Sequence, residues 1–197
     1  MTEYVFPHYA KQEDEISKIQ GISRLFAYPK TPHYKNNGKK VIMDSGAFGL
    51  SLQGRKINKN HMIKLDKHYR DNVRENTLCI APDEYLNPMQ SMMNIRKWFA
   101  NDYYPHVSAV IQADQEKIID INNLKFQAHY YSSFTDEICF SNNSLTSEMA
   151  KMYKLEELFK YMKKDLKIKW IHILGAGWDL EDIKGWLDIG YYDSLDS

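Results

Sequence analysis

The chain has 197 residues, of which 43% are hydrophobic, and this length and composition are typical of a single globular domain spanning 1–197. Its 26 basic and 26 acidic residues give a formal net charge of zero, which argues against a protein that coats nucleic acid through bulk positive charge. The N-terminus lacks a signal-peptide pattern and no apolar run is long enough to span a membrane, so we expect a cytoplasmic protein without a membrane partner.

Short apolar runs alternate with helical patterns along the chain. The runs that predict buried strands lie at 24–29, 41–46, 77–83, 108–114, 137–142, 170–177 and 191–197. The segments between them that predict helices lie at 58–73, 87–102, 115–124, 144–166 and 179–190. Ser144 or Thr146 is the candidate cap of the long helix, and Asp179 is the candidate cap of the last one.

This alternation indicates an α/β fold with a parallel sheet, either an open doubly wound sheet or a (β/α)8 TIM-type barrel. Polar residues at the C-terminal ends of five strands favour the barrel, because its chemistry sits on that rim. These residues are Asp44, Asp83, Gln112, the Ser141-Asn142 pair and Asp196. A full barrel usually takes about 250 residues, so we predict a short one, incomplete at the C-terminus if no eighth strand is present.

The two cysteines and seven histidines do not predict a metal site. Cys79 and Cys139 lie in separate apolar runs without a CxxC motif, and we interpret them as reduced core thiols. The histidines form no HxH or HExxH pair, and the chain contains no P-loop, GxGxxG or GxSxG motif. We therefore expect neither a metal nor a cofactor.

The carboxylates at the strand ends have two interpretations. An aspartate after a strand commonly caps the next helix or turn. Asp44, Asp83 and Asp196 together, on one rim, also suit chemistry at a glycosidic carbon, where one carboxylate acts as nucleophile and another as general acid.

Other residues near these strand ends also leave two interpretations open. Phe48 is either a packing ring or a platform on which a flat base stacks, and Gly46 and Ala47 leave room for that base. Gln112 binds either a base edge or neighbouring backbone. The LGAG turn at 174–177 is either a phosphate cradle or a tight turn between strand and helix. The basic segment 55–60 and the lysines of 151–169 are either solvated surface or contacts to a nucleic-acid backbone.

Four segments, in order, resemble the tRNA-guanine transglycosylase (queuine tRNA-ribosyltransferase) family. DSGAF at 44–48 is similar to the family's DSGGF motif, and closest to the form in phage and bacterial relatives that insert 7-deazaguanines into DNA. CIAPDE at 79–84 resembles the strand whose aspartate reads the base, and VIQAD at 110–114 resembles the strand ending in VQG. The segment 173–197 resembles the part in which an LGxG turn and a helix precede an Asp-x-x-Asp pair.

The resemblance implies a (β/α)8 barrel and exchange of guanine for a 7-deazaguanine through a covalent aspartyl-sugar intermediate. It implies that Asp196 is the nucleophile and Asp44 the general acid and base, while Asp193 matches an earlier, structural aspartate. It implies that the base is bound by the remaining site residues, which are Ser45, Phe48, Asp83, Gln112, Gly175 and Gly177.

The chain departs from the family in three ways. It lacks the CxCxxC…H zinc module that follows the nucleophile, and with it a zinc-binding subdomain. Residues 140–143 lack the family's glycine pair, and the last barrel strand is not evident. Either a second copy or a partner chain completes the barrel, or the chain is a shortened member of the family. The missing zinc module favours DNA over tRNA as the substrate.

Three functions therefore remain as hypotheses. The first is a DNA guanine transglycosylase. The second is a tRNA-guanine transglycosylase or a hydrolase that cleaves a nucleoside bond. The third is a non-catalytic subunit that binds the base and needs a partner chain.

Overall fold

The computed structural model describes residues 3–7, 23–32, 40–99, 106–115, 119–142, 145–177 and 180–196. The strands in these residues are β1 (Glu3–Tyr4), β2 (Phe6–Pro7), β3 (Arg24–Ala27), β4 (Val41–Asp44), β5 (Thr77–Ile80), β6 (His106–Ile111), β7 (Glu137–Ser141), β8 (Trp170–Leu174) and β9 (Ser194–Leu195). The helices are α2 (Ala47–Leu52), α3 (Lys59–Asn72), α4 (Pro88–Phe99), α5 (Ile121–Ser132), α6 (Ser147–Met152), α7 (Leu155–Lys164) and α8 (Leu180–Ile189).

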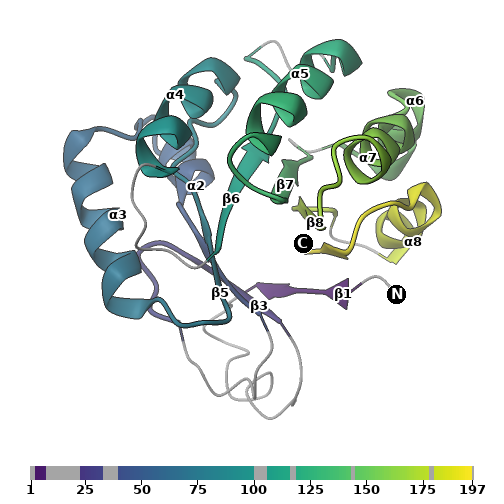
Figure 1. Ribbon diagram of the computed structural model, residues 1–197. Helices are drawn as coiled ribbons and strands as arrows, with labels where there is room; N and C mark the ends of the chain where they lie inside the picture. Colours follow the sequence, from purple (N-terminus) through teal and green to yellow (C-terminus); the bar gives the residue numbers. More distant parts are fainter. Residues whose placement is uncertain are drawn as a thin grey trace.

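All the strands pair in parallel in one sheet of order β1-β9-β8-β7-β6-β5-β4-β3-β2. The sheet curls, and the helices lie in an arc outside it (Figure 1). This confirms the predicted α/β class and gives the layout of a partial TIM-type barrel. The complete eightfold alternation is not present in the described residues, because helices follow only β4 to β8 there.

The N-terminal segment contacts both ends of the sheet, which the sequence did not predict. β1 pairs with β9 and β2 pairs with β3, and only Val5 separates these two short strands. The amide of Val5 also donates a 2.8 Å hydrogen bond to the carbonyl of Leu195. Figure 1 shows the chain's C-terminal end directly beside β1. The last described strand therefore has a neighbour on each side, β8 and β1.

Apolar side chains pack on both faces of the sheet. The larger core lies between the sheet and the helices, and alternate strand residues such as Val41, Met43 and Phe140 point into it. The smaller core lies on the inner face and includes Val5, Ile42, Leu78, Ile80, Val110 and Cys139. Because successive strand residues point to opposite faces, near-continuous apolar strands of this kind require cover on both sides.

Helices α3, α5 and α6 each begin after a polar residue whose side chain caps them. Asn58 accepts from the amide of His61 at the start of α3, and Thr146 accepts from Met149 at the start of α6. Asp120 caps α5, so this helix begins at Ile121 and not at 115 as the sequence suggested. The cap roles considered for Ser144 and Asp179 lie outside the described residues.

Two other helix predictions need correction. The helix predicted at 144–166 is divided into α6 and α7, because Lys154 adopts a left-handed conformation with φ of 55°. Helix α2 was not predicted at all. It begins at Ala47, directly after the cap residue Gly46, whose φ is 75°. A Cβ added at Gly46 would lie 3.0 Å from the carbonyl oxygen of Tyr28. Glycine suits this turn because it has no Cβ to strain.

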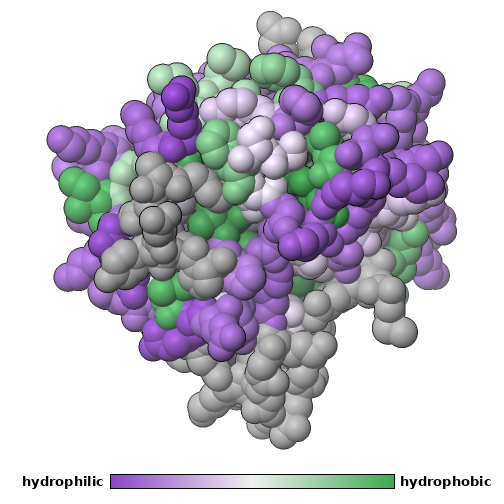
Figure 2. Space-filling model, in the orientation of Figure 1, coloured by the Kyte–Doolittle hydropathy of each residue, from purple (hydrophilic) through white to green (hydrophobic). Residues whose placement is uncertain are grey.

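The surface mixes hydrophilic and hydrophobic residues. Figure 2 shows separate hydrophobic areas between hydrophilic ones on the face seen in Figure 1. Among the described residues, no helix is both long enough and apolar enough to cross a bilayer.

Candidate active site

Three carboxylates stand at the C-terminal rim of the curled sheet. Asp44 is the last residue of β4, Asp83 comes three residues after β5, and Asp196 directly follows β9. Parallel strands place these ends on one side of the sheet. Asp83 and Asp196 are buried and Asp44 is half-buried, so all three are largely removed from water.

Burial governs the protonation of these carboxylates. It raises the pKa of Asp44 from 3.8 to about 6, against hydrogen bonds from the Gly46 and Ser45 amides that lower it. Burial, and after it the negative charge of Asp44, raises the pKa of Asp83 from 3.8 to about 7. For Asp196 burial is again the largest cause of a pKa near 7, and Asp44 again contributes. Asp44 therefore interacts with both other carboxylates, and protonated and ionised forms coexist near neutral pH.

Ser45 links the β4 and β5 ends of the rim. Its hydroxyl donates a 2.7 Å hydrogen bond to Oδ1 of Asp83 and accepts one from the amide of Ala47 at 3.2 Å. Oδ2 of Asp44 accepts from the Gly46 amide at 3.3 Å, so Asp44 binds the turn before α2. It does not cap that helix, because Gly46 is the cap residue and no side-chain bond caps α2.

Asp196 is held by the turn after β8. Its Oδ1 accepts from the Gly175 amide at 2.6 Å, and its carbonyl accepts from the Ala176 amide, also at 2.6 Å. Both of these LGAG amides are thus directed at Asp196, as expected for a tight turn and not for a free phosphate cradle. Gly177, with φ of 138°, lies against Asp182 at the start of α8, where a Cβ would approach within 2.6 Å.

Asp193 occupies the other end of β9. Its Oδ2 accepts from the Ile171 amide at 2.7 Å and pairs with Nζ of Lys163 at 2.5 Å. The side chain of Asp193 therefore links β9 to β8 and α7, away from the rim. The choice of Asp196 over Asp193 as the nucleophile stays a prediction.

Gln112 is fully buried and holds the loop that carries Asp83. Its Oε1 accepts from the Leu86 amide at 2.8 Å, and its Nε2 donates to the Glu84 carbonyl at 2.9 Å and to Oγ of Ser91 at 3.0 Å. Of the two interpretations that the sequence left open, the structure shows binding to neighbouring backbone. Gln112 thereby fixes the loop in which Leu86 adopts a φ of 57°.

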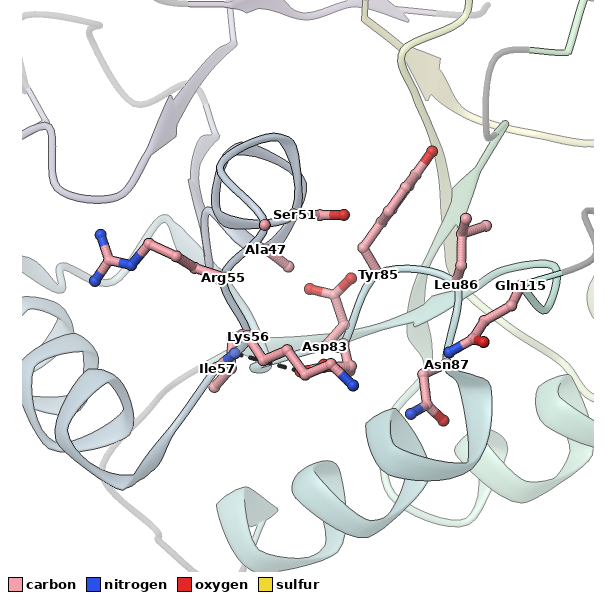
Figure 3. Close-up of a pocket in the computed structure, with 12 residues that line it drawn as sticks. Ala47, Ser51, Arg55, Lys56, Ile57, Asp83, Tyr85, Leu86, Asn87 and Gln115 are labelled. Atoms are coloured by element: carbon pink, nitrogen blue, oxygen red, sulfur yellow. Dashed lines mark hydrogen bonds between the residues drawn. The ribbon is translucent and has the colours of Figure 1, made fainter.

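A cavity of about 270 Å³ opens beside Asp83, between the end of α2 and the loop after β5 (Figure 3). In Figure 3 the carboxylate of Asp83 points toward the space between Ala47 and Tyr85. The wall of this cavity carries both charges and polar groups. Its lining residues are Ala47, Ser51, Gly54, Arg55, Lys56, Ile57, Asp83, Glu84, Tyr85, Leu86, Asn87 and Gln115.

Phe48 stands next to this cavity and is 51% exposed. Its ring meets that of Tyr85 edge to face, with centroids 5.1 Å apart and planes at 70°. Phe48 is exposed and Tyr85 is half-buried, so Phe48 is not a core residue. The pair offers an aromatic surface at the mouth of the cavity.

The remaining candidate groups do not form a metal centre. Within the described residues, no three His, Cys, Asp or Glu side chains are arranged to hold a metal ion. Cys79 and Cys139 are buried free thiols, as predicted. Burial also raises the pKa of both thiols, so they remain protonated.

The sequence did not single out Tyr85, Ser91 or His172. Tyr85 follows the CIAPD segment in an unpatterned stretch and Ser91 lies in the helix predicted at 87–102, and their only signal was proximity to Asp83. His172 sits at the centre of the WIHIL strand, where a polar residue in an apolar run was a usable signal. It lies on the same strand as the LGAG turn that binds Asp196.

No protein-family model matches the chain, and the comparison with curated proteins finds no significant match. By its fold and the geometry of its rim, the chain is an α/β protein with a curled parallel sheet and buried carboxylates at the C-terminal ends of the strands.

Proposed function

We propose that the chain is a guanine transglycosylase that replaces guanine in DNA with a 7-deazaguanine base. The single observation that supports this most is the set of three buried, electrostatically coupled carboxylates on one rim. Such a set keeps one carboxyl group protonated while another is ionised, as acid-assisted displacement at a glycosidic carbon requires. The motif resemblance supplies the choice of guanine and of DNA.

The proposed reaction proceeds from the form in which Asp44 holds the proton and Asp196 is ionised, which is the less populated arrangement because the pKa of Asp44 is about 6 and that of Asp196 about 7. In this form the ionised Asp196 attacks C1′ of the deoxyguanosine. The bond from C1′ to N9 breaks, its electron pair leaves with guanine, and protonated Asp44 gives its proton to the departing base. The incoming deazaguanine then loses its N9 proton to Asp44 and attacks C1′, which releases Asp196. Two displacements at C1′ retain its configuration, and no oxidant, reductant or cofactor is consumed.

The cavity beside Asp83 is the proposed base site. Asp83 accepts hydrogen bonds from the guanine N–H groups, and Ser45 keeps its carboxylate oriented. The base stacks on Phe48, with Tyr85 behind it, a contact worth about 1 to 3 kcal/mol per base. The observed cavity of about 270 Å³ is near the small end of ligand sites, which suits a single base.

Gly175 and Gly177 take a supporting part in this proposal, along with Gln112. Gly175 orients Asp196 through its amide, and Gln112 fixes the Asp83 loop from behind. Gly177 lets the turn pass close to α8. These three residues thus shape the site for the substrate more than they touch it.

The phosphate backbone is proposed to lie along the basic end of the cavity. Arg55 and Lys56 follow α2 and line the cavity opening. Two phosphate contacts do not require a basic protein overall, which agrees with the zero net charge.

We also propose that Glu3–Pro7 serves as the first strand of a closed barrel. Its halves pair with β9 and β3, so among the described strands β9 has a neighbour on each side and offers no edge near Asp196 for another chain. The chain is therefore expected to act without a partner subunit.

The experiment incubates the purified chain with duplex DNA, single-stranded DNA or tRNA and a radiolabelled 7-deazaguanine. Label should enter DNA, and a covalent protein–DNA adduct should be trapped by denaturation. Asp196→Asn should abolish the adduct and keep base binding, while Glu75→Gln, which changes an exposed carboxylate, should change neither.

Other outcomes select the other hypotheses. Label in tRNA alone supports the tRNA enzyme, and release of guanine without incorporation supports a hydrolase. Base binding without any chemistry supports the non-catalytic subunit. An adduct that persists in Asp196→Asn refutes the assignment of the nucleophile.

A further inference from the structure

His172 is a buried imidazole with one unsatisfied nitrogen. It lies in the middle of β8, has no exposed surface, and stacks flat on Trp170 with ring centroids 5.2 Å apart and planes at 1°. Its Nδ1 is 2.9 Å from Oγ of Ser194. Its Nε2 makes no hydrogen bond among the described residues. A buried polar atom without a partner is costly, so its position calls for a reason.

The carboxylate of Asp196 is the group that Nε2 approaches. The distance from Nε2 to Oδ1 is 3.7 Å, just beyond a hydrogen bond. β8 and β9 are paired with His172 opposite Ser194, so Ser194 and Asp196 project toward the same side of the sheet as His172. The same Oδ1 atom accepts from the Gly175 amide at 2.6 Å. Oδ1 of Asp196 thus already accepts one hydrogen bond, and a small movement would bring Nε2 of His172 within hydrogen-bond distance.

The surroundings of His172 keep its ring neutral. Burial, and after it the charge of Lys40, lowers the pKa of His172 from 6.5 to about 3. Nζ of Lys40 lies over the Trp170 ring, 4.2 Å from its centroid, and pairs with Glu137 of β7. From β7 the residue opposite His172 is Cys139, an uncharged thiol. A neutral imidazole carries one N–H, and its other nitrogen accepts.

We propose that His172 is a positioning residue that donates its Nε2–H to the ionised carboxylate of Asp196, while the Ser194 hydroxyl donates to Nδ1 and fixes that tautomer. The inference rests on the proposed function for its catalytic consequence, because it takes Asp196 as the nucleophile. Closing the gap from 3.7 Å to a charge-assisted hydrogen bond of about 2.8 Å needs a shift of about 1 Å. No proton is transferred, and His172 does not touch the base or the sugar.

Holding the second lone pair of Oδ1 leaves the other carboxylate oxygen free to face C1′. Loss of the donor therefore misplaces the nucleophile without changing the base site. The expected result is a lower kcat with little change in KM, together with a rise in the pH at which activity appears, because the ionised carboxylate has lost a hydrogen bond.

Two substitutions separate donation from packing. His172→Gln places an amide N–H near the position of Nε2, while His172→Asn is too short to reach Asp196. We expect adduct formation to slow by about 100-fold in His172→Asn, the typical cost of a misplacement of about 1 Å, and by less than about fivefold in His172→Gln. His129→Asn, at an exposed histidine in the last turn of α5, serves as the control for the substitution itself. Circular dichroism and urea unfolding of each variant show whether it folds.

Nitrogen NMR of the ¹⁵N-histidine-labelled wild-type chain tests the contact without any activity. At pH 8 the proton of His172 should reside on Nε2, and Asp196→Asn should shift the Nε2 resonance. If no variant or wild-type chain shows base exchange, the proposed function fails while this measurement still decides the contact. A proton found on Nδ1, or equal rates in the Gln and Asn variants, overturns the inference.

Discussion

Replacing Asp83 by asparagine tests whether the ionised form of a buried rim carboxylate lowers the free energy of unfolding. Burial raises the pKa of Asp83 from 3.8 to about 7. Since one pKa unit equals about 1.4 kcal/mol, keeping this group ionised in the folded state costs up to about 4 kcal/mol. Asparagine has nearly the same shape, and its Oδ1 can still accept from the Ser45 hydroxyl.

Proton linkage gives the direction in which the free energy of unfolding changes with pH. Between about pH 4 and pH 7 the folded chain holds a proton on Asp83 that the unfolded chain has released, so this residue's stabilisation declines as pH rises through that window. His172 acts in the opposite direction, because its pKa is lowered on folding and the unfolded chain binds the extra proton. The wild-type pH profile is therefore a sum, and only its difference from the variant isolates Asp83.

We expect Asp83→Asn to gain about 2.7 kcal/mol in free energy of unfolding, relative to the wild type, when the pH is raised from 5 to 8. Urea unfolding at both pH values measures this, and Glu75→Gln, at an exposed site, should gain nothing. A pH-independent difference between Asp83→Asn and the wild type would refute the reasoning. It would mean that Asp83 is ionised as freely in the folded chain as in the unfolded one.

Urea unfolding tests three further substitutions, one at Gln112 behind the candidate site and two in the helical layer. Gln112→Leu should destabilise the chain by about 2 to 3 kcal/mol by leaving the Leu86 amide and Glu84 carbonyl unpaired, whereas the exposed Gln53→Leu should stay near the wild type. Gly185→Ala should cost about 1 to 3 kcal/mol, because its Cβ would lie 2.2 Å from Oγ of Ser147, and Gly49→Ala in open space should instead stabilise by up to about 1 kcal/mol. Lys154→Gly should stabilise by about 1 kcal/mol by relieving the left-handed backbone at φ of 55°, and the opposite sign would contradict the assigned break between α6 and α7.

The strands after residue 40 were predictable because each is a short apolar run ended by a polar residue. Asp44 closes β4 as expected, and β5, β7 and β8 fall within the predicted runs, while β6 begins at His106, before its predicted run of 108–114. Their near-continuous burial produces a strong signal. The grouping of polar residues at one rim was predictable as well, because a parallel sheet with sequential strand order brings the C-terminal strand ends together.

The rest depended on contacts that sequence periodicity does not carry. Helix α2 is six residues long and contains Gly49, so its pattern is too short to recognise. The break at Lys154 places a left-handed residue in a charged stretch that otherwise favours a helix. Gln112 could have bound a ligand or the backbone, and only the position of the Leu86 amide decides between them.

The N-terminal segment shows most clearly how support for the site comes from distant sequence. β9 has only two residues, too few to hold a buried carboxylate by themselves. It is fixed from one side by β8, through the Asp196 amide and the Ile173 carbonyl at 3.0 Å, and from the other by the Val5 amide and the Leu195 carbonyl. Asp196 thus lies where the first and last described strands meet. A carboxylate with a pKa near 7 resists burial, and pairing on both sides of β9 is what holds it at the rim.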